Sequence, residues 1–164
     1  MTFSGDKLLG GAQAGIIVGR SDLVQACARH PLARALRPGG LVLSSLQATA
    51  LAYLDRSAAT TIPFWRMVAT PVTELRRRAE ALCSALASST FTAAPMEALP
   101  GAGSAPGISM ESFGVVCSGD HLHALRANAT PVIARVRDGH TYLDLRGVDP
   151  EDDAIVFQAL RALG

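Results

Sequence analysis

The sequence has little lysine, little cysteine, few aromatic residues and no long apolar run. Its 164 residues contain 18% charged side chains and carry a formal net charge of +1, which gives no electrostatic case for binding nucleic acid or an anionic membrane. The longest apolar stretches fall far short of the roughly 18 to 20 residues that span a bilayer. The first residues also lack the basic and apolar regions of a secretory signal. Hydrophobic residues at 49% exclude intrinsic disorder, so we expect a soluble, cytoplasmic globular protein.

The scarce cysteines and histidines predict neither a disulfide framework nor a metal site. Cys27, Cys83 and Cys117 are odd in number and widely spaced, and no two form a C-x-x-C pair. We therefore expect buried free thiols. His121 and His123 are two residues apart and the remaining histidines are isolated, so structural or solvated histidines are favoured over metal ligands.

Lysine is the scarcest of the charged residues. Of the 15 basic residues, 14 are arginine and Lys7 is the one lysine. The 28 alanines show the same bias, for which a GC-rich coding sequence is an ordinary explanation. A desolvated lysine amine can lose its proton and form an imine with an aldehyde, which arginine cannot do. From composition alone, two interpretations stay equally open: amine chemistry at Lys7, or a lysine that persists by chance at an exposed site.

The first part of the chain predicts strands and helices separated by proline and glycine. Residues 14–19 are apolar and β-branched between glycines, which is typical of a buried strand. A helix is expected over residues 22–29 with Ser21 as N-cap, ended by His30 before Pro31. Pro31 then begins a short helix in which Arg34 and Arg37 share one face. A longer helix is expected from about residue 44 to residue 55.

A second unit is expected from Pro63 onward, because proline at this point interrupts both periodicities. Its pattern is helix, strand, helix, hairpin, helix, which indicates an α+β sandwich with helices on one face of an antiparallel sheet. The arginines at 76–78 are expected mostly on a solvated helix face. The elements expected here are a helix from Thr70 and Pro71 to about Ala87, a weak strand and loop over 90–107, a strand at 113–117, a helix at 120–126, a hairpin turning at Asp138 and Gly139, and a final helix capped by Asp149.

The segment around Lys7 also resembles a known family. Residues 3–19, F-S-G-D-K-L-L-G-G-A-Q-A-G-I-I-V-G, closely resemble the pyridoxal-phosphate lysine segment of bacterial L-seryl-tRNA(Sec) selenium transferase, or selenocysteine synthase. The resemblance continues through five further segments to the C-terminus. They are His30–Arg37, Leu46–Leu54, Ile62–Pro63, Pro131–Arg135 and Leu143–Arg146.

The resemblance implies an α/β fold and a set of site residues. Residues 1–62 would be the C-terminal end of the large domain of a fold-type I transferase that depends on pyridoxal 5'-phosphate, and residues 63–164 its small α+β domain. Lys7 matches the lysine that holds the cofactor as a Schiff base, and Asp6 matches an acidic active-site residue. Arg34 and Arg37 look like two family arginines that contact the phosphate of the selenium donor. The resemblance implies no metal.

The activity implied is conversion of seryl-tRNA(Sec) to selenocysteinyl-tRNA(Sec) with selenophosphate. The resemblance also implies a homo-oligomer, because subunits of the full family assemble into a large ring. Only the C-terminal part of the family's chain is matched, and the tRNA-binding domain has no counterpart here. Met1 stands where the family usually has valine inside an active-site strand. We therefore expect a truncated or mis-started portion of a longer enzyme.

Two other functions remain open from the sequence. One is a related fold-type I lyase or transferase that acts on a free amino acid. The other is a non-catalytic remnant or interaction fragment that folds through its small domain. For Arg34 and Arg37, the alternative to phosphate binding is a pair of ordinary surface arginines.

Overall fold

The computed structural model describes residues 1–101 and 103–163 and divides the chain into two compact units. The first unit is Met1–Arg66 and the second is Met67–Gly164. The boundary expected between residues 62 and 63 falls at the start of helix α5 (Pro63–Ala69), whereas the division follows Arg66. Ala102, within the loop expected near residues 101–107, and Gly164 lie outside the described residues.

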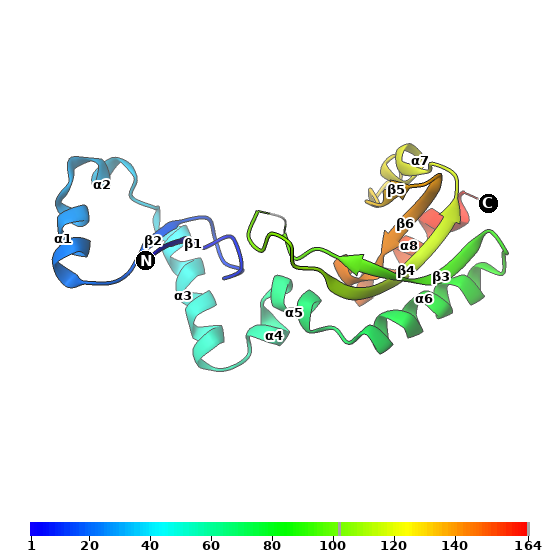
Figure 1. Ribbon diagram of the computed structural model, residues 1–164, viewed down its shortest axis with the longest axis horizontal. Coiled ribbons are helices and arrows are strands. Elements are labelled where there is room, and N and C mark those ends of the chain that lie inside the picture. Colours follow the sequence, from blue (N-terminus) through cyan, green and yellow to red (C-terminus); the bar gives the residue numbers. More distant parts are fainter. Residues whose placement is uncertain (102, 164) are drawn as a thin grey trace. The chain divides into compact units, whose positions relative to one another are not determined.

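The first unit combines a small antiparallel sheet with short helices and one long helix (Figure 1). Thr2 pairs with Ile17 and Ser4 pairs with Gly15. Ile17 and Val18 are exposed, so the expectation of a buried strand is wrong for this chain: the sheet has only two strands, and nothing in the described residues covers its outer face. Its elements are β1 (Thr2–Ser4), β2 (Gly15–Ile17), α1 (Ser21–Arg29), α2 (Pro31–Ala35), α3 (Gly40–Leu54), α4 (Ala58–Thr61) and the start of α5.

Proline and glycine set the helix ends of the first unit largely as expected. His30 has extended backbone angles before Pro31, and its Nδ1 accepts a hydrogen bond from the Leu32 amide at 3.2 Å. The N-cap expected at Ser21 is wrong. Arg20 occupies that position, and Ser21 is the first helical residue, with its hydroxyl accepting a bond from Gln25.

Helix α3 is apolar on all sides. It contains no charged residue, and Thr49 is its one buried residue. Four of its leucines are largely exposed: Leu41, Leu43, Leu51 and Leu54. Helices of this kind are usually buried on every face, so the first unit presents apolar surface of the kind that other polypeptide normally covers.

The second unit is a four-stranded antiparallel sheet in the order β3-β4-β6-β5, with its core between the sheet and the helices α6 and α8 (Figure 1). The mixed α/β class and the antiparallel sheet expected here are confirmed. Its elements are α6 (Val72–Leu86), β3 (Phe91–Ala98), β4 (Met110–Ser118), α7 (Leu122–Arg126), β5 (Arg135–Arg137), β6 (His140–Asp144), the 3-10 turns η1 (Leu145–Gly147) and η2 (Pro150–Asp152), and α8 (Asp153–Arg161).

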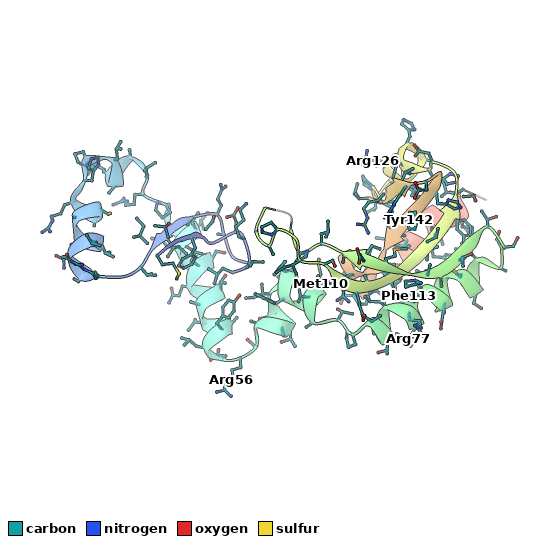
Figure 2. The ribbon with its side chains drawn as sticks, viewed as in Figure 1. Arg56, Arg77, Met110, Phe113, Arg126 and Tyr142 are labelled. Atoms are coloured by element: carbon teal, nitrogen blue, oxygen red, sulfur yellow. The ribbon has the colours of Figure 1, made fainter. Side chains whose placement is uncertain are left out.

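Alternation along β4 builds the core of the second unit. Phe113, Val115 and Cys117 are buried on the face that meets α6. Phe113 is labelled in Figure 2, and the guanidinium of Arg76 lies 5.0 Å from the centre of its ring. Leu143 of β6 is 1% exposed and completes this layer.

Turns and caps in the second unit confirm some expectations and overturn others. Asp138 and Gly139 both have positive φ, 50° and 73°, as the tight hairpin turn requires. Asp149 caps the C-terminal helical segment by accepting a bond from the Glu151 amide, although the first turn is 3-10 and α8 begins at Asp153. The cap expected at Thr70 is wrong, since Pro71 is the N-cap residue of α6.

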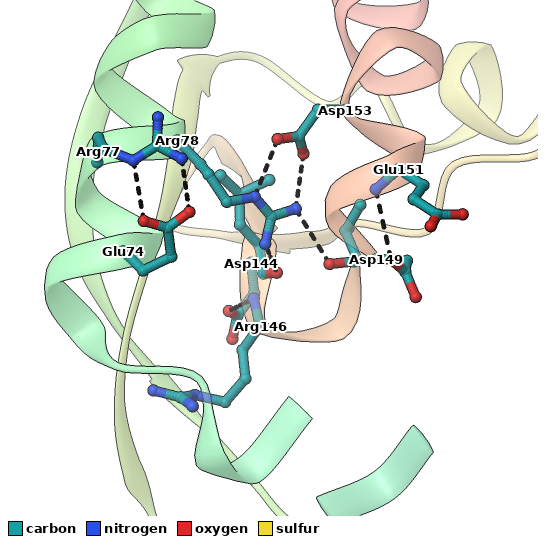
Figure 3. Close-up of polar contacts among 10 residues, drawn as sticks. Glu74, Arg77, Arg78, Asp144, Arg146, Asp149, Glu151 and Asp153 are labelled. Carbon is teal, nitrogen blue, oxygen red and sulfur yellow. Dashed lines mark hydrogen bonds and ion pairs between the residues drawn. The ribbon is translucent and has the colours of Figure 1, made fainter. Parts of the chain in front are cut away.

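Arg76 and Arg77 of α6 are exposed as expected for this run, but Arg78 is not. Arg78 is 4% exposed, and its guanidinium donates to both carboxylate oxygens of Asp153, at 2.9 and 2.6 Å, and to the carbonyls of Leu145 and Val148 (Figure 3). Arg77 pairs with Glu74 on the exposed side. The three side chains point in different directions because successive helical residues are about 100° apart, and the one nearest α8 is buried by its carboxylate partner.

A second buried arginine holds the segment that enters the second unit. Arg146 is 7% exposed, and its Nη1 lies 2.9 Å from the carbonyls of Met67 and Thr70 and 3.2 Å from that of Val68. Its Nη2 donates to the Glu111 carbonyl at 2.6 Å. The Asp144 carboxylate accepts from the Arg146 amide (Figure 3). Because Met67, Val68 and Thr70 are at or just beyond the C-terminus of α5, the cation lies where helix carbonyls lack partners.

Candidate active site

Lys7 lies in a tight turn between β1 and β2, and backbone hydrogen bonds fix that turn. The Gly10 amide donates to the Lys7 carbonyl, the Gly11 amide to the Gly5 carbonyl, and the Gly5 amide to the Ala14 carbonyl, each at 2.9 Å. The sheet pairing of Ser4 with Gly15 closes the base of the turn. The lysine is therefore carried by ordered backbone.

Two glycines in this turn are required by their surroundings. A Cβ on Gly5 would lie 2.4 Å from the Ala12 carbonyl oxygen, and a Cβ on Gly10 would lie 2.6 Å from Cγ2 of Ile62. Gly10 also has φ of 74°, which side-chain-bearing residues rarely adopt. The glycines of the Lys7 segment thus let the turn lie close to its neighbours.

Ser4 at the end of β1 and Asp6 and Lys7 in the turn make the side-chain polar contacts of this site. The Lys7 amine lies 3.9 Å from Oδ2 of Asp6, and the side chain of Lys7 is 58% exposed. The Ser4 hydroxyl donates a hydrogen bond to Oδ1 of Asp6. That bond is the main cause of a lowered pKa of Asp6, with smaller contributions from its own backbone amide and the Lys7 charge, while burial acts in the opposite direction. Asp6 is therefore a carboxylate anion beside an exposed amine.

The two arginines do not share a helical face. Helix α2 ends at Ala35, so Arg34 is helical and Arg37 lies beyond the end. The reason is local: Arg37 precedes Pro38, and a residue before proline is disfavoured in the α region. Both arginines are exposed. Neither makes a hydrogen bond or ion pair within residues 1–101 and 103–163, and none joins them to the Lys7 turn.

Tyr53 and Trp65 contact the Lys7 turn, and the sequence reasoning missed both. The Tyr53 hydroxyl lies 2.9 Å from the Leu9 carbonyl and accepts a hydrogen bond from Nε1 of Trp65. Tyr53 falls within the Leu46–Leu54 segment that carries the resemblance, but only the fold brings it against a turn 44 residues away.

The cysteines are further reactive side chains of this chain. Across the described part of the chain, no group of three or more His, Cys, Asp or Glu residues could hold a metal ion. All three cysteines are free, but Cys27 is exposed and Cys83 is half-buried, so the expectation of buried thiols is confirmed only for Cys117. Burial raises the pKa of Cys83 and of Cys117. No helix in the described ranges is long and apolar enough to cross a membrane.

The chain matches one family over most of its length. The family described as L-seryl-tRNA selenium transferase matches residues 1–149. A Moorella thermoacetica protein named L-seryl-tRNA(Sec) selenium transferase is 41% identical over 173 aligned positions, covering 98% of this chain and 37% of the relative. Proteins with the same name are 34% identical in Clostridium perfringens, covering 100% of this chain and 38% of the relative, and 39% identical in Serratia proteamaculans, covering 94% and 37%.

These similarities define the class: the matching family and the relatives are named as selenium transferases. The chain belongs to the L-seryl-tRNA selenium transferase family. It spans a little over a third of the length of the curated relatives it matches.

Proposed function

We propose that this chain carries the cofactor lysine and the small domain of a transferase that converts seryl-tRNA(Sec) to selenocysteinyl-tRNA(Sec) with selenophosphate. Family membership and the relatives' names support the reaction. The observation that carries the proposal is the one lysine of the sequence, exposed on an ordered turn beside a carboxylate. In this proposal, residues 1–62 are the C-terminal end of a fold-type I large domain and residues 63–164 are the small domain.

The amine of Lys7 is chemically suited to bind the aldehyde of pyridoxal 5'-phosphate. It is a primary amine, as imine formation requires, and its exposure lets an aldehyde reach it. When bound, the cofactor supplies the electron sink for loss of the seryl hydroxyl as water. Lys7 Nζ provides the covalent attachment, and as a free amine it can hold or release a proton at that atom. The Asp6 carboxylate keeps a negative charge next to that nitrogen.

Arg34 and Arg37 are proposed to bind the phosphate group of selenophosphate. Their support is chemical: guanidinium groups pair with phosphate through two parallel hydrogen bonds. Both guanidinium groups are exposed and have no intramolecular partner among the residues that the structure describes. They come from the end of α2 and the segment just after it.

The partners of the full reaction follow from the same proposal. Seryl-tRNA(Sec) is our proposed substrate, since the relatives' name contains it. We propose the cytoplasm as the location of the protein, because a charged tRNA of this kind is used there. A homo-oligomer is proposed as the functional form. The exposed apolar surface of α3 supports assembly with further polypeptide.

The test is to trap the cofactor on the protein. The purified protein is mixed with pyridoxal phosphate, reduced with borohydride, and mapped by mass spectrometry. We expect saturable labelling at Lys7 that Lys7→Ala abolishes. The N-terminal amine is the internal control, and it donates a hydrogen bond to the Val18 carbonyl at 2.8 Å. Labelling that is absent at Lys7, or no greater there than at the N-terminus, would overturn cofactor binding by this chain.

A second candidate function is a non-catalytic interaction fragment. The exposure of Leu41, Leu51 and Leu54 on one uncharged helix favours it. The same protein would be mixed with a full-length relative and analysed by size-exclusion chromatography with light scattering. A stable complex together with no labelling at Lys7 would support this function over the catalytic one.

A further inference from the structure

One face of α3 packs against the turn that carries Lys7. Leu46, Thr49 and Tyr53 are spaced three and four residues apart and therefore lie on the same side of the helix. Cδ2 of Leu46 is 2.9 Å from the position of a Cβ on Gly5, and Oγ1 of Thr49 is 2.8 Å from that of a Cβ on Gly11. The turn therefore lies directly on this face, with its glycine backbone against the helix side chains.

Tyr53 makes the polar contact between this helix face and the turn. Its hydroxyl donates to the Leu9 carbonyl at 2.9 Å, and the Leu8 carbonyl lies 3.4 Å away. Leu8 and Leu9 immediately follow Lys7 and lie inside the turn that the bond from the Gly10 amide to the Lys7 carbonyl closes. The hydroxyl thus holds the backbone just after the lysine.

Trp65 fixes the position of the Tyr53 side chain. Its Nε1 donates to the Tyr53 hydroxyl, which leaves the hydroxyl proton free for the carbonyl. Its Cδ1 lies 3.8 Å from the position of a Cβ on Gly10, and its ring packs edge-on against Phe64 with centres 5.1 Å apart. Trp65, Tyr53 and the Leu9 carbonyl therefore form a chain of hydrogen bonds that ends at the turn.

We infer that Tyr53 and Trp65 are positioning residues that hold the Lys7 turn in the conformation presenting its amine to the cofactor. The effect on the amine rests on the proposed function, whereas the effect on the turn does not. The phenol hydroxyl bonds the Leu9 carbonyl, so removing it frees the turn at Leu9. Removing the indole N–H leaves that hydroxyl in place but without the donor that orients it. Neither residue touches the cofactor in this inference; both act through the backbone that carries Lys7.

The central experiment compares Tyr53→Phe with a matched control. Tyr142, the other tyrosine of the sequence, lies on β6 in the second unit, and Tyr142→Phe removes a hydroxyl without touching the turn. Amide hydrogen exchange is measured at Gly10 and Gly11, whose N–H groups close the turn. We expect Tyr53→Phe to speed exchange there about five-fold, as loss of one hydrogen bond of ordinary strength does. Exchange in the second unit should not change, and Tyr142→Phe should leave the turn unaffected.

A second readout uses the one tryptophan of the sequence. Because Trp65 donates to Tyr53, its emission spectrum reports on this contact. We expect a shifted emission in Tyr53→Phe and none in Tyr142→Phe. Trp65→Phe should speed turn exchange less than Tyr53→Phe does, because the bond from Tyr53 to Leu9 remains. The double variant should be no faster than Tyr53→Phe alone, because the groups act in one chain.

The labelling of Lys7 then separates the inference from the proposed function. Weaker pyridoxal-phosphate labelling of Lys7 in Tyr53→Phe, relative to the N-terminal amine, supports the full inference. Unchanged exchange at Gly10 and Gly11 overturns it, and so does faster exchange with equal Lys7 labelling in the two proteins. If the unaltered protein is not labelled at Lys7, the proposed function fails, and the exchange result alone decides whether Tyr53 and Trp65 hold the turn.

Discussion

Ser4 favours the ionised form of Asp6 in the candidate site through one hydrogen bond. Its hydroxyl donates to Asp6 and is the largest cause of the lowered pKa of that carboxyl. A carboxyl whose folded pKa lies below its unfolded value stabilises the fold most fully above the unfolded pKa, and this stabilisation is lost as pH falls through the folded pKa. The Asp6 carboxylate should therefore stay ionised to lower pH than an ordinary aspartate.

Ser4→Ala is expected to raise the pKa of Asp6 toward its ordinary value, because the bond that favours the anion is removed. The midpoint can be followed by carbon-13 NMR of the Asp6 carboxyl carbon during an acid titration. Ser21→Ala is the control, since that hydroxyl contacts Gln25 and no carboxylate. Equal Asp6 midpoints in Ser4→Ala and the unaltered protein would contradict this assignment.

At the scale of single residues, the sequence predicts what depends on near neighbours. His30 before Pro31 and the Asp138-Gly139 turn fold as expected, because proline sterics and positive φ act within a few residues. The burial of Arg78 was missed because its partner Asp153 is 75 residues away. Tyr53 was missed for the same reason, since a tyrosine on an apolar helix gives no sign of the carbonyl it will meet.

Among the elements, α6 and α8 are joined by the buried Arg78–Asp153 pair. The Arg78 side chain is 3% exposed and that of Asp153 is 28% exposed. The guanidinium also donates to two backbone carbonyls, so it is well satisfied only while the carboxylate stays in place. Removing one member of a buried pair leaves an uncompensated charge.

Asp153→Ala is expected to lower the free energy of unfolding of the second unit by about 3 kcal/mol. Glu74→Gln breaks the exposed pair with Arg77 and should cost less than about 1 kcal/mol. Urea unfolding followed by far-ultraviolet circular dichroism measures both variants. A similar small cost for the two would show that the Arg78 pair is no more important than a surface pair.

The sequence predicted which helices exist better than it predicted where they begin and end. The apolar spacing predicted α3 from about residue 44, but it begins at Gly40, with Gly39 as its N-cap residue. The expected shared face of Arg34 and Arg37 failed at Pro38. Periodicity identifies that a helix exists, whereas its ends depend on caps and neighbours that a period does not encode.

Across the whole molecule, the two units differ in how much they bury. Among the described residues of Met1–Arg66, only Gly5, Thr49 and Ile62 are buried. The second unit has a continuous core from α6 through the sheet to α8. A unit with its own core can fold alone, whereas one that leaves its apolar helix exposed needs further polypeptide to cover it.

Residues 67–164, expressed separately, are therefore expected to unfold cooperatively at the midpoint that circular dichroism gives for this unit in the whole chain. Residues 1–66 should show no cooperative transition and should bind a hydrophobic dye such as ANS. Thermal scans of the two pieces and of the whole chain make the comparison. A sharp transition in residues 1–66 without dye binding would refute this account of the first unit.

The hydrogen bonds of Arg146 should protect the nearby backbone from proteolysis. Its guanidinium donates to the carbonyls of Met67, Val68, Thr70 and Glu111. A protease needs several residues of extended, detached chain, and this segment cannot detach without leaving a buried guanidinium unpaired. Cleavage at residues 67–70 would therefore require opening of the whole second unit, at a rate that follows its global stability. The first residues of the second unit are thus protected as part of its fold, although their position at the unit boundary would suggest an exposed linker.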